Sequence, residues 1–300
     1  MKIKDSEIRE ILKKYDVGEL KKKKLIYDFF NYIYKIKTTK GNFIFKIMRF
    51  DSKKNLDSEL RILNVLSKEI PHSLPIKSRD GRFYLNWKLH QVLIAPFLDG
   101  KPEKIGHNLP ETALRELGRY CALIHKTRNI NGIKKKNLYS YLKAFFDRFD
   151  KNSREVKLAK KIFRILEKSR FNEVSLPSGL IHGDLHTENI LVKNGSLTYV
   201  MDFEDSYVGD FVNDLALIVI DTCVDGNGKL SRKRLSKLLS SYEKIRKLTK
   251  LERKYLRGSM LLIGIYALHF LMMLNGINNR KNFNNYFIRK YIRMLKVLGI

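Results

Sequence analysis

Residues 180–192, with the sequence LIHGDLHTENILV, carry side chains that suit the transfer of a phosphoryl group. An apolar, strand-like run delivers His182-Gly183-Asp184 into a loop, and Asn189 stands just before a second apolar run. Phosphoryl transfer requires a carboxylate that accepts the proton of the attacking hydroxyl group. It also requires an amide and a second carboxylate that hold Mg²⁺ on the phosphates. Asp184 is the candidate for the proton acceptor, and Asn189 is the candidate for the amide.

The second carboxylate follows a predicted hairpin. Asn194-Gly195 is typical of a tight turn between two strands, and the returning strand meets Asp202-Phe203-Glu204. Because a hairpin folds its two ends together, we expect Asn189 and Asp202 to lie close and to bind the same Mg²⁺ ion. Asp184 is then expected on the side from which the acceptor hydroxyl arrives. Each motif alone could be a simple turn or a strand end, but their order together favours catalysis.

Other side chains near this loop have more than one interpretation. His182 and His186 are four residues apart, a spacing that suits zinc on a helix, with Glu188 nearby. Gly183 and the strand-like flanks argue against a helix, so zinc is not favoured. His186 is interpreted as structural or as a contact near the active site. Glu204 could contact the metal at a distance, or it could cap or pair structurally.

A lysine and a glutamate in the N-terminal part supply a candidate phosphate anchor. Lys46 lies in the strand-like run 43–47, and Glu59 lies on a predicted helix, on the same stripe as its leucines. An acidic group on an otherwise buried stripe needs a charge partner, because an unpaired buried charge is costly. We therefore expect Glu59 to pair with Lys46 and to hold its ammonium group against the α- and β-phosphates of a nucleotide.

The elements that must position these residues fall into a β-rich part and a helical part. Residues 31–49 predict a β-hairpin, residues 56–66 carry leucines at helical spacing, and residues 82–97 predict two more strands. Helical patterns dominate the rest of the chain around the hairpin described above. We expect an α+β fold with a small β-rich N-terminal lobe, residues 1–95, and a larger helical C-terminal lobe, residues 96–300.

The motifs resemble those of aminoglycoside phosphotransferases and of choline and homoserine kinases, the small-molecule relatives of protein kinases. HGDLHTEN is similar to their catalytic loop, VMDFEDSYVGDFVNDLA to their metal-binding segment, and LGRYCALIHK, ending at His125, to the helix before the catalytic region. The resemblance implies a protein-kinase-like two-lobed fold and a reaction that uses ATP and Mg²⁺.

The resemblance also implies a role for each candidate residue. Asp184 would be the catalytic base, Asn189 and Asp202 the Mg²⁺ ligands, and Lys46 the phosphate anchor paired with Glu59. Asp214 would tie the catalytic loop in place without touching substrate. One feature departs from many kinases, because residues 27–34, YDFFNYIY, contain no glycine where a glycine-rich phosphate cover is usual. Phosphate binding is therefore expected to depend more on Lys46 and Mg²⁺.

The phosphate acceptor is expected to be a hydroxyl group of a small molecule. Residues 214–249 resemble the corresponding segment of homoserine kinases, so homoserine is the leading candidate, with choline, amino sugars, aminoglycosides and other sugars as alternatives. A kinase-like protein that binds nucleotide or nucleic acid without catalysis is a further alternative. The presence of Asp184, Asn189 and Asp202 together argues against it, because a pure binder does not require all three.

Composition bounds the remaining possibilities. The chain carries 60 basic and 31 acidic side chains, a net charge of +29, but the basic residues recur along its whole length without a stripe typical of nucleic-acid binding. A nucleic-acid partner is therefore not favoured. The two isolated cysteines and the absence of a signal-peptide pattern at the start predict a cytoplasmic protein. Residues 258–279 carry no acidic or basic side chain apart from His269, but their apolar centre, from Met260 to Leu274, is shorter than the ~20 residues of a membrane span, and we expect a buried helix there.

Overall fold

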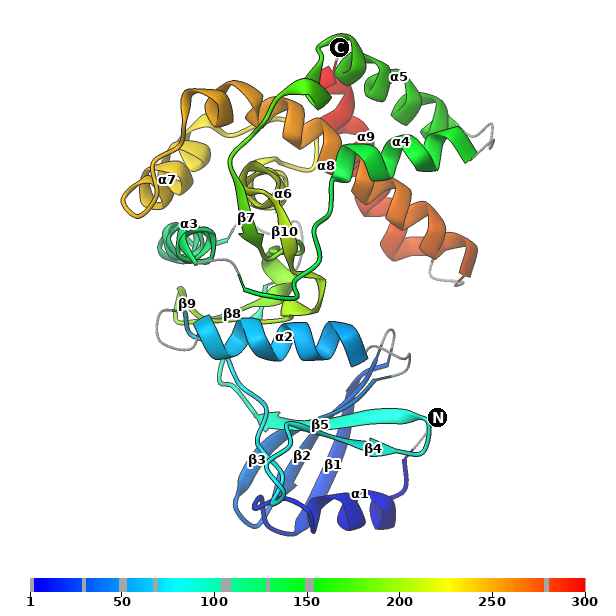
Figure 1. Ribbon diagram of the computed structural model, residues 1–300, viewed down its shortest axis with the longest axis vertical. Helices are drawn as coiled ribbons and strands as arrows, with labels where there is room; N and C mark the ends of the chain where they lie inside the picture. The colour runs from blue at the N-terminus through cyan, green and yellow to red at the C-terminus, as the bar shows by residue number, and fades with distance from the viewer. Residues whose placement is uncertain are drawn as a thin grey trace. The chain divides into compact units, whose positions relative to one another are not determined.

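The computed structural model describes residues 3–28, 31–48, 53–66, 70–103, 109–127, 130–148, 154–277 and 281–299. The chain divides into two compact units, Met1–Asp99 and Gly100–Ile300. The division expected from the sequence falls four residues earlier, between residues 95 and 96. Figure 1 shows the strands of a single sheet in the first unit and most of the helices in the second.

The first unit is built on a five-stranded antiparallel sheet in the order β1-β2-β3-β5-β4. Its strands and helices are α1 (Asp5–Leu12), β1 (Leu20–Tyr27), β2 (Asn31–Thr38), β3 (Gly41–Met48), α2 (Lys53–Leu66), β4 (Tyr84–Trp87) and β5 (His90–Pro96). The predicted hairpin is confirmed, because β2 pairs with β3 up to Thr38 opposite Gly41. The two strands predicted in residues 82–97 are β4 and β5.

The two faces of this sheet are covered by different helices. Ile8 and Ile11 of α1 share a buried cluster with Phe45 and Ile47, so α1 covers the face to which these β3 side chains point. Leu93 of β5 instead packs with Leu56 and Leu60 of α2. Successive residues of a strand point to opposite faces of the sheet. Leu93 of β5 therefore packs against α2, whereas its neighbours Val92 and Ile94 belong to the cluster that contains α1.

The second unit contains two small antiparallel sheets and helices packed around them. Strands β6 (Lys101–Pro102), β8 (Ile190–Lys193) and β9 (Ser196–Val200) form one sheet, and β7 (Ser178–Ile181) pairs with β10 (Tyr207–Asp210) in the other. The helices are α3 (Glu111–Lys126), α4 (Leu138–Arg148), α5 (Arg154–Lys168), α6 (Phe211–Cys223), α7 (Arg232–Glu243), α8 (Lys250–Ile277) and α9 (Lys281–Gly299). Both cysteines are buried free thiols.

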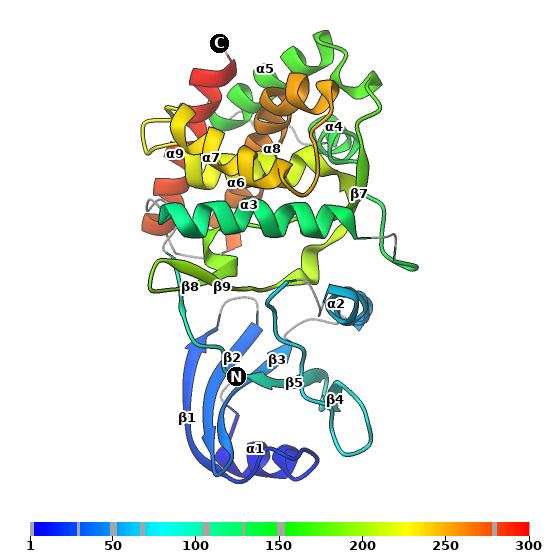
Figure 2. The same ribbon diagram turned by 90° about the vertical axis from the view of Figure 1, so that its left-hand side faces the viewer.

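Helix α6 forms the centre of the second unit. All of its residues except Leu217 are buried, and it contacts α3, α7 and α8. Figure 2 shows α3 lying between the β8–β9 hairpin and helices α6 and α7, in agreement with its contacts to β9 and α7. A helix that is apolar nearly all round must be enclosed by other elements. Polar residues on α6 are therefore exceptional and bear directly on the site.

The apolar segment 258–279 lies largely within α8. Its residues from Met260 to Ile265 are buried, and α8 packs against α6 and α9 as the expected core helix. Over the described ranges, no helix combines the length and the apolar content that crossing a membrane requires.

Candidate active site

The proposed base lies on a loop that begins directly at the end of strand β7. Asp184 follows His182 and Gly183, and its side chain is 43% exposed. Gly183 has φ +82°, and a Cβ atom at this position would collide with the carbonyl oxygen of Asp205. Only glycine adopts this backbone with so little space, so Gly183 lets the chain turn sharply and present Asp184 at the surface.

Two buried carboxylates of helix α6 hold the backbone of this loop. Asp214 accepts hydrogen bonds from the backbone N–H groups of His182 (2.7 Å) and Gly183 (2.9 Å), and Asp221 accepts one from Thr187 (2.8 Å). Asp214 is 2% and Asp221 is 7% exposed. Residues seven apart lie two turns along one helix face, so the two aspartates fix both ends of the same loop. The anchoring role that the resemblance implied for Asp214 is confirmed.

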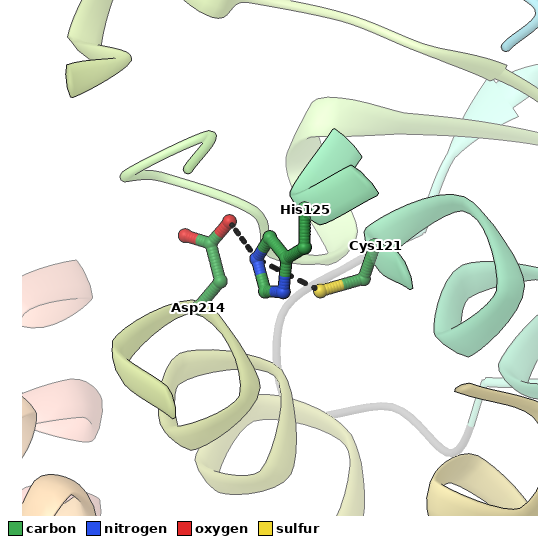
Figure 3. Close-up of side chains that lie close together, drawn as sticks. All are labelled: Cys121, His125 and Asp214. Carbon is green, nitrogen blue, oxygen red and sulfur yellow. Dashed lines mark hydrogen bonds and ion pairs between the residues drawn. The ribbon is translucent and has the colours of Figure 1, made fainter. Parts of the chain in front are cut away.

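A chain of hydrogen bonds orients Asp214, and Figure 3 shows its last link, between His125 and Asp214. Arg246 donates to the Tyr242 hydroxyl (2.9 Å), which therefore donates to Nδ1 of His125 (2.7 Å). Burial lowers the pKa of His125, so the ring is neutral and its single proton lies on Nε2. That proton points to Oδ2 of Asp214, 3.2 Å away. Burial opposes ionisation of Asp214, but the bonds from His125 and the loop hold its pKa below its usual range.

Cys121 completes the buried group in Figure 3, and its thiol lies 3.6 Å from Nε2 of His125. Cysteine, histidine and aspartate at this spacing are chemically able to bind a metal ion. The hydrogen bonds within the group argue against it, because Nε2 of His125 is directed at Oδ2 of Asp214, 3.2 Å away. Both oxygens of Asp214 also accept hydrogen bonds already. The group is an anchor for the loop.

The predicted hairpin joins the two proposed metal ligands. Strand β8 pairs with β9 through a turn at Asn194 and Gly195, both with positive φ as such a turn requires. At the open end, the backbone N–H of Met201 donates to the carbonyl oxygen of Asn189 (2.9 Å). Asn189 therefore lies beside the residue that precedes Asp202, as the sequence predicted.

The side chains of Asn189 and Asp202 have the chemistry that Mg²⁺ prefers. The Asn189 amide nitrogen donates to the backbone oxygen (2.8 Å) and to Oδ2 (2.9 Å) of Asp184, which leaves the amide oxygen as its metal donor. Asp202 is exposed, and its carboxylate makes no hydrogen bond or ion pair with any residue that the structure describes. One amide oxygen and one open carboxylate fit Mg²⁺, which is usually bound by one or two carboxylates together with substrate phosphates.

Asp202 also adopts an unusual backbone conformation. Its φ and ψ angles are +63° and +66°, in the left-handed region that non-glycine residues rarely occupy. It opens the short turn η3 (Phe203–Asp205), in which Phe203 is 1% exposed and Glu204 is half-buried. Such backbone strain is concentrated at functional sites.

His182 connects the loop of Asp184 to the turn of Asp202. Its Nε2 lies 2.9 Å from the carbonyl oxygen of Met201, and its Nδ1 accepts a hydrogen bond from the Asp184 backbone at 3.3 Å. The ring proton is therefore assigned to Nε2. The ring also packs on Phe203, with centroids 4.5 Å apart. The sequence pattern marked His182 only as part of a motif, and this bridging role was missed.

His186 contacts the proposed base directly. Its Nε2 lies 3.3 Å from Oδ2 of Asp184. Burial acts to lower the pKa of His186, but the negative charge of Asp184 outweighs it and raises the pKa to about 9. Because His182 is bound to Met201 and His186 to Asp184, the two imidazoles do not share a zinc site. His186 thus contacts the candidate base, and its role near an active site stays a prediction.

Lys46 and Glu59 belong to the first unit. Lys46 lies on β3 opposite Leu93, and directly opposite residues of paired strands share a face. Leu93 packs against Leu56 and Leu60 of α2, the helix that carries Glu59. Lys46 is thus on the face that α2 covers, and both charged side chains are half-buried. Their pairing and their contact with phosphate stay predictions.

Comparison with known proteins agrees with this geometry. Residues 28–248 match the phosphotransferase enzyme family. The homoserine kinase of Bradyrhizobium diazoefficiens is 27% identical over 257 residues, covering 82% of this chain and 77% of that enzyme. The homoserine kinase of Polaromonas naphthalenivorans is 36% identical over 83 residues only, 27% of this chain and 26% of that enzyme.

Solved structures show the same fold at low sequence identity. Amicoumacin kinase hAmiN, in complex with AMP-PNP, Ca²⁺ and Ami, has a TM-score of 0.75 at 14% identity, covering 98% of this chain and 94% of that one. A microcompartment-associated aminopropanol kinase has a TM-score of 0.75 at 19% identity, covering 98% and 96%. The predicted α+β, kinase-like fold is confirmed. The family match covers most of the chain. The chain therefore belongs to the phosphotransferase enzyme family, as a small-molecule kinase.

Proposed function

We propose that the protein transfers a phosphoryl group from ATP to a hydroxyl group of a small molecule with the help of Mg²⁺, and that homoserine is the leading acceptor. One observation carries the proposal. Asp184 and Asn189 are hydrogen-bonded to each other on a loop that buried aspartates fix, and the hairpin ties Asn189 to the neighbour of Asp202. A base and an amide that are hydrogen-bonded to each other, with a carboxylate joined to them by the hairpin, are the groups that phosphoryl transfer requires.

The proposed roles follow from the properties of each side chain. Asp184 is half-exposed and accepts the proton of the acceptor hydroxyl as it attacks. Asn189 and Asp202 hold Mg²⁺, which when bound neutralises negative charge on the transferred phosphate. Lys46 binds nucleotide phosphates, and Glu59 orients it. ATP is supported by the structural neighbours, among them one solved with AMP-PNP and another with ADP.

Homoserine is favoured among acceptors by the relatives that match most of the chain. Enzymes named homoserine kinase are 25–27% identical over 80–90% of this sequence. Structural neighbours include kinases named for amicoumacin, spectinomycin and aminopropanol, so choline, amino sugars, aminoglycosides and other sugars stay alternatives. A non-catalytic nucleotide- or nucleic-acid-binding role would give binding without turnover on any acceptor.

The test is a Mg²⁺-dependent phosphotransfer assay over amino acids, amino alcohols and sugars, on the wild-type protein and two variants. Asp184→Asn keeps the size of the side chain but removes the proton acceptor, and turnover should fall about 10²–10⁴-fold. Its affinity for MgATP should change by less than about tenfold, or ~1.4 kcal/mol. Asp202→Asn should instead weaken nucleotide binding in Mg²⁺ as well as turnover. Near-normal turnover of Asp184→Asn would refute the catalytic assignment.

A further inference from the structure

Lys136 lies on a segment that is hydrogen-bonded to the scaffold of the catalytic loop. The backbone N–H of Val208 donates to the carbonyl oxygen of Lys134 (2.8 Å), and that of Lys136 donates to the carbonyl oxygen of Val208 (3.1 Å). Val208 belongs to β10, which pairs with β7, the strand that ends at Ile181, directly before the loop of His182 and Asp184. The position of Lys136 is therefore fixed relative to the loop that carries Asp184.

The side chain of Lys136 is surrounded by three tyrosine rings. Its ammonium nitrogen lies 4.5 Å from the ring centroid of Tyr266, 5.0 Å from that of Tyr141 and 5.4 Å from that of Tyr207. It also donates a hydrogen bond to the hydroxyl of Tyr266 at 3.1 Å. Ring faces attract a cation within about 6 Å of the centroid, so the tyrosines hold the ammonium group in one place.

Within the described part of the chain, this half-buried cation forms no ion pair. Among the described residues, no carboxylate oxygen lies within 4.0 Å of the Lys136 nitrogen. Burial accordingly lowers the pKa of Lys136, although the charge of Asp205 acts in the opposite direction. Ring faces and one neutral hydroxyl offset only part of the cost of burying a charge. An anionic ligand would supply the negative charge that pairs with Lys136.

The lysine and Tyr266 lie close to the proposed base. Burial raises the pKa of Tyr266, and the negative charges of Asp205 and Asp184 add to the increase. The ring of Tyr207 gives the geometric link to the loop of the base. One atom of this ring lies 3.1 Å from where a Cβ atom on Gly183 would stand, and the Lys136 nitrogen lies 5.4 Å from the centroid of the same ring. The ammonium group is therefore near the turn that presents Asp184, the carboxylate that is proposed to receive the acceptor proton.

We propose that Lys136 and Tyr266 bind a carboxylate group of the phosphate acceptor, which makes the substrate a hydroxy acid or a hydroxy amino acid. The inference rests on the proposed function and deepens it. Asp184 and Asp205 would repel an acid approaching the base, and Lys136 is a cation placed to offset this repulsion, in addition to His186 beside Asp184. Three tyrosines could otherwise receive a quaternary ammonium group such as that of choline, but here the protein's own lysine occupies their faces. A cationic amino sugar would be repelled at these rings by the positive charge of Lys136.

The experiment compares two acceptors that differ in the carboxylate. L-Homoserine carries it, and 3-aminopropan-1-ol has the same hydroxyl and amine without it. In Lys136→Met, which keeps the chain length and removes the charge, KM for L-homoserine should rise about 10- to 100-fold, as for a lost charge-assisted hydrogen bond. KM for ATP should change by less than about threefold, and KM for 3-aminopropan-1-ol should stay the same or fall.

Two further variants separate recognition from folding. Lys135→Met removes the same charge from the exposed neighbouring side chain and should leave both KM values unchanged. Lys136→Arg keeps a positive charge and should recover part of the affinity for L-homoserine. Thermal midpoints of all three variants show whether the fold is retained.

The possible outcomes distinguish this inference from the function on which it rests. If the wild-type enzyme phosphorylates 3-aminopropan-1-ol, choline or amino sugars but no hydroxy acid, the carboxylate site is wrong while phosphotransfer stands. An equal rise in KM for both acceptors in Lys136→Met would also overturn it, because a structural role affects both alike. If no acceptor of either class is phosphorylated with MgATP, both the inference and the proposed function fail.

Discussion

The two loops of the candidate active site, residues 182–189 and residues 202–205, are held in different ways. The first donates backbone N–H groups to two buried carboxylates of α6. The second begins at exposed Asp202 in a left-handed conformation, and its buried side chain, Phe203, packs on His182. The proposed base is thus fixed by the protein interior, whereas the proposed metal ligand stays open to an ion. Changes beneath the first loop should lower stability and rate together, and changes in the second should lower metal-dependent binding and turnover without a loss of stability.

The largest effect should come from removing the anchor of the first loop. Asp214→Ala leaves the buried N–H groups of His182 and Gly183 and the ring proton of His125 without their acceptor. Each buried group left unsatisfied costs about 1–3 kcal/mol, so we expect the free energy of unfolding in urea to fall by about 3–5 kcal/mol. Turnover should fall as well, because the loop that carries Asp184 loses its fixed backbone.

Asp225 offers a matched control for this prediction. Its carboxylate also accepts two backbone N–H groups, from Asn227 and Lys229 at 2.9 Å each, but it lies exposed in a turn. Water can replace those hydrogen bonds, so Asp225→Ala should cost no more than about 1 kcal/mol. An equal loss of unfolding free energy in Asp214→Ala and Asp225→Ala would show that the burial of Asp214 does not increase its contribution to stability.

Sequence reasoning identified the parts of the site that local motifs encode. The hairpin between Asn189 and Asp202 could be predicted because Asn194-Gly195 has the backbone preferences of a tight turn, and pairing of its strands then brings the ends together. The role of Asp214 followed from a resemblance. Asp221 was missed, although it stands seven residues after Asp214 in an otherwise apolar helix, a spacing that puts both on one face.

Contacts between residues far apart in the sequence could not be predicted. His125 meets Tyr242 across 117 positions and Asp214 across 89, and nothing local in either segment specifies these partners. Lys136 likewise meets Tyr266 across 130 positions. Such pairs depend on how the helices pack, which a single sequence does not reveal. The sequence placed Lys46 in a strand facing the helix of Glu59, and the structure puts α2 on that face of the sheet, but the pairing of the two side chains stays a prediction.

A smaller effect on stability, opposite in sign, is expected in the second loop. Asp202→Gly removes the proposed metal ligand but relieves the left-handed backbone, which costs a non-glycine residue about 1 kcal/mol. The free energy of unfolding should stay the same or rise by up to about 1 kcal/mol. In the same variant, Mg²⁺ should no longer tighten nucleotide binding, as measured by titration with and without a chelator.

Asn194 provides the control for this substitution. It also has a positive φ, +52°, in the hairpin turn and lies away from the proposed ligands. Asn194→Gly should relieve strain to a similar degree and leave Mg²⁺-dependent binding and turnover intact. A marked loss of stability in Asp202→Gly would mean that Asp202 has a structural partner and that the second loop resembles the first.

A further effect concerns the pH dependence of the anchor beneath the first loop. Burial lowers the pKa of His125 in the folded protein, whereas in the unfolded chain it is about 6.5. Below pH ~6.5 the unfolded chain therefore binds a proton that the folded protein does not. The stability that depends on neutral His125 is complete above this pH and is lost as the pH falls towards the folded pKa. One such group contributes a slope of up to about 1.4 kcal/mol per pH unit.

His125→Gln removes this titration while keeping a side chain that can hydrogen-bond, so the variant should lose stability less steeply between pH ~6.5 and pH ~5. Burial also lowers the pKa of His72 and His269, which act in the same direction, so the quantity to compare is the difference in slope between wild type and variant in urea unfolding at several pH values. Asp214 titrates in a lower range, since its folded pKa lies below its usual value, and does not confuse the comparison. Equal slopes would mean that His125 is not held neutral by burial. The tautomer that directs its proton to Asp214 would then have to be reassigned.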